Sequence, residues 1–187
     1  MPAPEIRTVR EQIAWSYANL ARADAAIEGG VHKYGRVHHI IRTKLYKGLI
    51  SGEMSMRSLY YDERLKMTVP QACYYCGDKD NLTVDHLIPR IRGGPDEADN
   101  LIWACHSCNS SKQGRDMLQW MNAKGDFPSV LLLRRYLKIV ARFCEQRNCM
   151  DMDLSEAREI GLPFDLLCLP TEFPPLTRLH RWVYPTS

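Results

Sequence analysis

The chain has 187 residues and a mass of 21.6 kDa, which suits one hydrophobic core with a small second module and excludes a large multidomain protein. Hydrophobic residues make up 45% and charged residues 25% of the sequence, ordinary globular values that exclude a disordered chain. The formal net charge of +3 permits a polyanionic partner without requiring one.

The first residues lack the basic-then-apolar order of a signal peptide. The densest apolar run, Val130 to Leu133, is far too short to cross a membrane. We therefore expect a soluble cytoplasmic protein with no membrane partner.

Residues 1–68 predict a helical N-terminal module. Apolar residues recur at helical spacing over 6–20, and a glycine pair ends that run at 29–30. The pattern repeats over 34–49, and a third helix is expected over 54–66.

The segment 29–52 contains no acidic residue. Its cations and histidines are Lys33, Arg36, Arg42, Lys44, Lys47, His32, His38 and His39. Such a segment could bind a nucleic-acid backbone through its phosphates. It could equally be an amphipathic helix with a solvated basic face, and both interpretations stay open.

Residues 69–122 differ in composition and form the predicted central unit. The segment is rich in turns and cysteines, with short β-prone runs at 82–84 and 101–103. A helix over 109–122 is expected to close it. With helices on both sides, the predicted fold class is α+β and mainly helical.

Residues 123–187 predict a helix over 130–147, a short helix over 155–160 and a proline-rich tail. We expect this C-terminal segment to pack on the core, with the tail extended over the surface or over a partner. Aromatic residues make the tail a candidate docking segment for another protein. They are Phe173, Trp182 and Tyr184.

Four of the seven cysteines form two C-x-x-C pairs, Cys73 with Cys76 and Cys105 with Cys108. Each pair can form a tight turn that places two thiolates about 2.3 Å from one zinc ion. The sequence therefore predicts a four-cysteine structural zinc site, which would also rigidify a segment with few large apolar residues. The other three cysteines follow no ligand spacing.

A set of polar residues lies between and after these pairs. In chain order the sequence reads C-x-x-C, D-H-x-x-P from residue 85, G-G-x-x-x-x-x-N-L from residue 93, and C-x-x-C-N-x-x-K from residue 105. Over residues 72–118 this order resembles the zinc-stapled subclass of the HNH endonuclease family. The resemblance implies a ββα-metal core and hydrolysis of nucleic acid.

Cutting a phosphodiester requires an activated water, neutralisation of charge on the phosphate and stabilisation of the leaving oxygen. His86 is the candidate general base, because an imidazole with a pKa of about 6.5 can accept a proton near neutral pH. The resemblance implies that Asp85 ligates a divalent cation, and a carboxylate suits Mg²⁺. Neighbouring strand residues point to opposite faces, so bringing both to one site requires a local distortion or a strand end.

Asn109 opens the helix after the last cysteine, and its amide oxygen can complete the protein side of the Mg²⁺ site. Histidine is commoner at this family position, and asparagine suits Mg²⁺ better than softer metals. Mn²⁺ and Ni²⁺ are alternative cofactors. His106, between two zinc ligands, is an alternative third residue for which phosphate contact or solvent exposure is expected.

Asn100 has two compatible interpretations. As a turn residue it would bind backbone through its side chain. In the family that bond braces the loop bearing the base, so we assign Asn100 an orienting role toward His86. Four cations nearby are candidate phosphate contacts. They are Lys112, Arg90, Arg92 and Arg115, of which Lys112 is favoured by its place one helical turn after Asn109.

These residues together predict a metal-dependent HNH endonuclease acting on DNA, with RNA as the alternative substrate. One carboxylate-bearing cluster indicates a single catalytic metal. The alternatives are a non-catalytic zinc module that binds nucleic acid or protein, and a nuclease subunit that is active only when a partner docks on the helical flanks. Family members serve restriction, anti-phage defence and phage packaging, so a bacterial or phage origin is expected.

Overall fold

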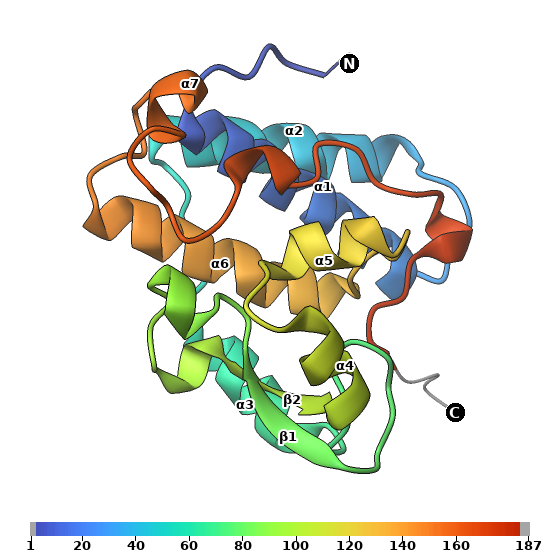
Figure 1. The fold of residues 1–187 in the computed structure, drawn as a ribbon. Coiled ribbons are helices and arrows are strands. Elements are labelled where there is room, and N and C mark those ends of the chain that lie inside the picture. Colours follow the sequence, from blue (N-terminus) through green and yellow to red (C-terminus); the bar gives the residue numbers. More distant parts are fainter. Residues whose placement is uncertain (1–2, 184–187) are drawn as a thin grey trace.

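The first two helices are antiparallel neighbours with clear sequence boundaries (Figure 1). The computed structural model describes residues 3–183. Helix α1 (Val9–Glu28) begins at a capping box, in which the Thr8 side chain accepts from the Glu11 amide and the Glu11 side chain accepts from Thr8. Helix α2 (Arg36–Ser51) ends at Gly52, whose φ of +77° favours glycine. Both helices confirm the prediction.

Helix α6 (Val130–Gln146) packs against α1 and forms the centre of the core. Its apolar stripe, which includes Leu133, Tyr136, Leu137 and Val140, is fully buried. One hydrophobic core contains residues from all three predicted segments, 1–68, 69–122 and 123–187. The helical flanks therefore share their packing with the central unit.

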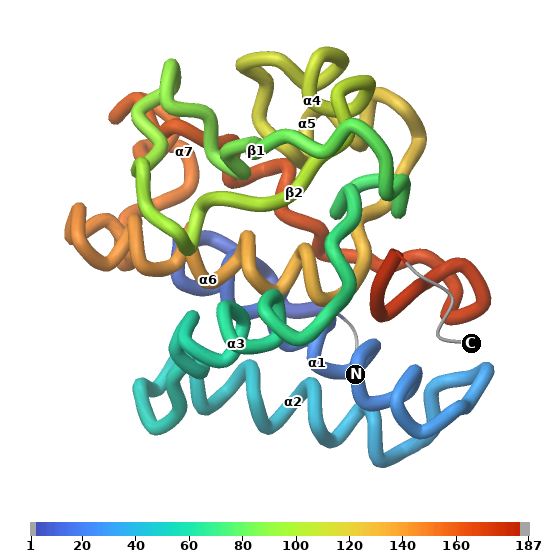
Figure 2. Tube along the Cα trace, turned by 90° about the horizontal axis from the view of Figure 1, so that it is seen from below, coloured from blue at the N-terminus to red at the C-terminus, as the bar shows by residue number. Residues whose placement is uncertain are grey.

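The central unit is a two-stranded antiparallel hairpin covered by a short helix. Its elements are β1 (Leu82–His86), β2 (Leu101–Cys105) and α4 (His106–Lys112). The register pairs Leu82 with Cys105 at one end and His86 with Leu101 at the other. Figure 2 shows this unit and α2 on opposite sides of α1 and α6. The mainly helical α+β fold is confirmed.

The third predicted helix starts later than expected. Helix α3 spans Tyr60–Thr68 instead of starting at residue 54. After Gly52 the chain turns back onto α2, where the Met54 amide donates to the Gly48 carbonyl at 2.9 Å and the Met54 side chain covers Gly48. Residues 53–59 therefore connect α2 to α3 without helical structure.

The predicted helix over 109–122 is two helices, α4 and α5 (Met117–Ala123). The helical backbone is interrupted at Gln113, whose φ is +52°. Helix α5 then starts at Asp116, whose carboxylate accepts from the amides of Leu118 and Gln119 at 3.0 and 3.2 Å.

The last part of the chain runs back over α1. The short helix α7 covers Leu154–Ala157, less than the predicted 155–160. Farther on, the Gln12 side chain donates to the carbonyls of Leu166 and Leu169, each at 3.1 Å. Trp182 packs edge-on against Tyr74 with ring centres 4.5 Å apart; Tyr184 lies outside the described residues. In the described part of the chain, every helix is too short or too polar to span a bilayer.

Candidate nuclease site

The four predicted zinc ligands come together at the end of the hairpin where Leu82 pairs with Cys105. The Sγ atoms of Cys73, Cys76, Cys105 and Cys108 all lie within 4.8 Å of one another. The Sγ atoms of Cys76 and Cys105 are 3.7 Å apart, close to the roughly 3.8 Å between ligands of a tetrahedral ion with bonds of about 2.3 Å. The cluster fits a structural zinc ion.

Local backbone geometry sets up both cysteine pairs. The first pair closes a turn in which the Gly77 amide donates to the Cys73 carbonyl at 2.8 Å, with Gly77 at a φ of +82°. In the second pair Cys105 caps α4. Burial raises the pKa of the Cys76 thiol to about 11, so a cation is needed to hold it as the thiolate at neutral pH.

Asp85 lies near the other end of the hairpin, on the face of β1 that α4 covers. Its carboxylate accepts from the Tyr75 hydroxyl at 2.6 Å and from the Lys112 ammonium at 3.1 and 3.2 Å. The Asp85 side chain is 8% exposed. Asp85 is thus a buried carboxylate held by two donors from different elements.

Lys112 is fully buried and joins the two predicted catalytic positions. Besides binding Asp85, its ammonium donates to the His86 carbonyl at 2.7 Å. Burial lowers the pKa of Lys112, and the charge of Asp85 opposes that shift. This interior position differs from the surface position that the predicted phosphate contact requires.

Asn109 lies on the face of α4 that contacts β1. Its amide nitrogen donates to Thr83 Oγ1 at 2.9 Å and to the Val84 carbonyl at 3.4 Å. Thr83 and Asp85 are two residues apart on β1 and therefore share one face of the strand. The predicted metal-ligand pair, Asp85 and Asn109, is consequently on the same side of the hairpin.

His86 is the last residue of β1 and pairs with Leu101 of β2. Its Nε2 atom contacts Asp96 Oδ1 at 2.8 Å, and Asp96 also binds Arg90 at 3.3 Å. The bond from His86 lowers the pKa of the Asp96 carboxyl, and the charge of Arg90 adds to this effect. Among the described residues, no hydrogen bond joins His86 directly to Asp85 or Asn109.

Asn100 is fully buried and bonds to two segments of the loop between β1 and β2. Its Oδ1 accepts from the Ile88 amide at 2.9 Å, and its Nδ2 donates to the carbonyls of Ile88 and Pro95, each at 2.8 Å. Gly94 lies so close that a Cβ there would be 1.9 Å from the Ile88 carbonyl oxygen. Ile88 is two residues after His86 in the chain. The bonds to Ile88 are therefore of the kind that the predicted orienting role of Asn100 requires.

A comparison with known protein families matches residues 73–115 to the HNH endonuclease family. This segment is an HNH endonuclease domain. It contains the four-cysteine cluster, both strands and α4. No curated protein and no solved structure matches the chain.

The remaining predicted contacts of the HNH domain lie on its surface. Arg90 and Arg92 are exposed on the loop after β1. Arg115 is also exposed, but its guanidinium donates to the carbonyls of Ser111 and Lys112 at the end of α4. His106 is exposed on the first turn of α4, with Nε2 at 3.4 Å from Ser110 Oγ.

The basic segment 29–52 lies away from the HNH domain. Figure 2 shows α2 on the far side of α1 and α6 from β1 and α4. Two of its cations and histidines point inward: Arg42 lies over the Trp15 ring at 4.6 Å, and His38 caps the start of α2.

Sequence reasoning missed two residues of the HNH domain whose side chains bind Asp85 and His86. Tyr75 stands inside the first C-x-x-C pair and binds Asp85, and its ring packs on Trp120 at 4.9 Å. Asp96 follows the glycine pair and binds His86. Both are polar residues inside recognised motifs, but only the fold shows where their side chains point.

Proposed function

We propose that the chain is a metal-dependent endonuclease that hydrolyses phosphodiester bonds of DNA. The observation that carries this proposal is the match of residues 73–115 to the HNH endonuclease family. The bonds of Lys112 to Asp85 and to the His86 carbonyl, and of Asn109 to Thr83, support it. A pure zinc-binding module has no need for Asp85, His86 and Asn109 beside its cysteines.

The residues present fit Mg²⁺. An ionised carboxylate has about four lone-pair sites, and Asp85 accepts two hydrogen bonds, one from Tyr75 and one from Lys112, so lone pairs remain for a metal ion. The Asn109 amide nitrogen is bound to β1, which leaves its oxygen as the ligand atom. Asp85 and Asn109 supply the hard oxygen ligands that Mg²⁺ prefers.

Mg²⁺ held by Asp85 and Asn109 would neutralise charge on the phosphate and at the leaving oxygen. His86 accepts the proton of the attacking water. Asn100 holds the loop that follows His86, and Lys112 holds both Asp85 and the His86 carbonyl. The exposed Arg90 and Arg92 bind phosphates of the substrate.

The test is cleavage of supercoiled plasmid with Mg²⁺, with His86→Ala as the informative variant and His180→Ala as its control. His180 is an exposed histidine outside the matched segment 73–115. We expect the wild type and His180→Ala to give nicked or linear product that EDTA abolishes, and His86→Ala to give at least about 100-fold less product.

A folded, zinc-loaded wild type that cuts neither DNA nor RNA with Mg²⁺, Mn²⁺ or Ni²⁺ would contradict the proposal. Retained DNA binding in a gel-shift assay would then favour a non-catalytic zinc module. Cleavage of RNA alone would keep the chemistry and change the substrate.

A further inference from the structure

The segment that contains Asn100 is held by cations from outside the HNH domain. Lys66 of α3 donates to the carbonyls of Ala98 and Leu101 at 3.2 and 3.1 Å. Arg135 of α6 donates to the Asp99 carbonyl at 2.8 Å. Backbone carbonyls on both sides of Asn100 are thus bound by side chains of the helical flanks.

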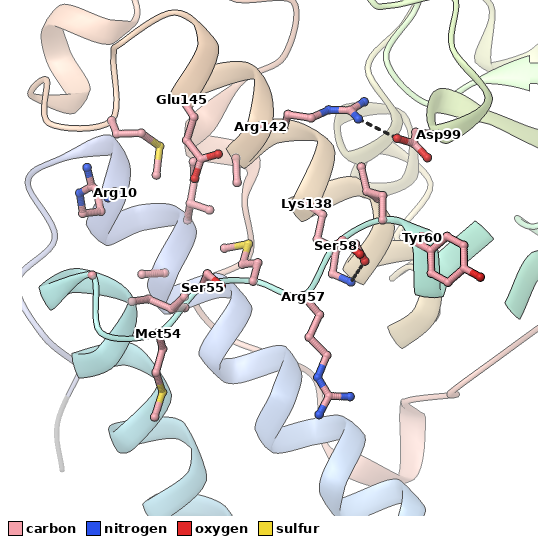
Figure 3. A pocket seen from close by; sticks show the side chains of 18 residues that line it. Arg10, Met54, Ser55, Arg57, Ser58, Tyr60, Asp99, Lys138, Arg142 and Glu145 are labelled. Carbon is pink, nitrogen blue, oxygen red and sulfur yellow. Dashed lines mark hydrogen bonds and ion pairs between the residues drawn. The ribbon is translucent and has the colours of Figure 1, made fainter. Parts of the chain in front are cut away.

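Arg142, two turns farther along α6, binds the carboxylates of the same segment. Its guanidinium contacts Asp99 Oδ2 at 2.7 Å and Glu97 Oε2 at 3.1 Å. Figure 3 shows Arg142 reaching from α6 to Asp99 beside a cavity of about 610 Å³. Because that cavity borders the Arg142 side chain, shortening this side chain leaves room for water and does not open a sealed void.

Glu63 of α3 joins two of these cations. It binds Lys66 at 3.1 Å and also pairs with Arg135. We name Lys66, Arg135 and Arg142 the loop clasp. Their side chains are 20%, 3% and 34% exposed, so Arg135 is the buried member and Arg142 the accessible one.

The contacts continue from the loop clasp toward the candidate base. The clasp holds residues 97–101, Asn100 within that segment holds Ile88 and Pro95, and the Leu87 amide donates to the Asn100 carbonyl at 2.9 Å. Leu87 follows His86 directly. A shift of Asn100 would therefore move the backbone to which the His86 ring is attached.

We propose that Arg135 and Arg142, together with Lys66, are positioning residues for His86. This inference rests on the proposed nuclease function. None of the three residues lies in the matched segment 73–115. Side chains of α3 and α6 therefore hold the loop between β1 and β2 in place. The HNH domain and its helical flanks then form one functional unit.

The test compares Arg142→Gln with Arg134→Gln in the full, zinc-loaded chain. Arg134 is the matched control: it lies on the same helix and binds Asp62 at 2.8 Å and Asp24 at 3.6 Å, away from 97–101. The first readout is hydrogen exchange at the Leu87 and Ile88 amides, both bonded to Asn100. We expect about tenfold faster exchange in Arg142→Gln and no change in Arg134→Gln.

The second readout is plasmid cleavage. We expect Arg142→Gln to lower kcat tenfold or more with little change in KM, because a misplaced base slows the chemical step. Arg142→Lys should restore part of kcat, since one ammonium replaces the forked contact to both carboxylates incompletely.

The two readouts separate this inference from the proposed function. Unchanged exchange at Leu87 and Ile88, or an equal effect of Arg134→Gln, would overturn the inference whether or not the wild type cuts. Faster exchange with unchanged kcat would also overturn it. Faster exchange confined to Arg142→Gln in a chain that cuts nothing would support the clasp and reject the nuclease.

Discussion

At one end of the HNH hairpin four cysteine Sγ atoms lie within 4.8 Å of one another. At the other end Lys112 binds Asp85 by a hydrogen bond and an ion pair, and Asn100 separately binds Ile88 and Pro95 of the following loop. Helix α4 connects the two, starting at the cysteines and ending at Lys112. We expect the cysteine end to depend on a zinc ion for its stability, and the His86 end to depend on buried polar side chains and on the flanking helices. Each end can therefore be disrupted separately.

Loss of the zinc site has the largest expected effect. Cys108→Ser should remove the metal and unfold the HNH domain, because a structural zinc contributes about 10–16 kcal/mol, comparable to the whole stability of a domain. Zinc content by atomic absorption and near-UV circular dichroism measure the two effects. Cys168→Ser is the control, since Cys168 lies outside the cluster; equal zinc content in both variants would contradict the assignment.

Loss of the Asp85–Lys112 ion pair has the second largest expected effect on stability. Lys112→Met would leave Asp85 buried without its cation and should lower the free energy of unfolding by about 3–5 kcal/mol, measured by urea denaturation with zinc retained. Lys124→Met is the control, because Lys124 forms an exposed pair with Asp126 at 3.0 Å and should cost at most about 1 kcal/mol. Similar losses in both variants would mean that the Asp85–Lys112 pair adds nothing.

The hairpin ends also differ in how far the sequence predicted them. The cysteine spacing gave all four members of the cluster, because a metal site demands fixed ligand types at short spacing. The family resemblance implied that Asn100 braces the loop bearing His86, and its position before a strand indicated a turn residue. The sequence could not show where a side chain points. Lys112 was expected to contact a phosphate, yet its side chain is fully buried against Asp85.

The fold shows the same limit. The long apolar stripes of α1, α2 and α6 predicted these helices, because helical periodicity over many residues is unambiguous. The break between α4 and α5 was missed, since a left-handed residue such as Gln113 has no strong sequence signal. The hydrogen bonds and ion pairs between α6 and residues 97–99 join positions more than 30 residues apart, so no local pattern could reveal them.

Substitution of Asn100 is expected to have a smaller effect on stability. Asn100→Ala removes the donors to the Ile88 and Pro95 carbonyls without introducing a charge, and should cost about 1–3 kcal/mol because buried polar groups lose their partners. Thermal unfolding and zinc content together measure it. Zinc binding should stay unchanged, and a loss of zinc in this variant would show that the two hairpin ends are not independent.

The smallest effect on stability is expected at the surface of the His86 end. Arg90 is 65% exposed and binds Asp96 at 3.3 Å, so Arg90→Ala should change the free energy of unfolding by less than about 1 kcal/mol.

If Arg90 binds a phosphate, the variant should lower the salt dependence of DNA binding by roughly one counterion. Binding isotherms over a range of salt concentrations, with metal omitted to prevent cutting, measure that slope. Arg147→Ala is the control, because Arg147 lies at the end of α6 over Phe143; equal slopes in the two variants would remove Arg90 from the DNA contact.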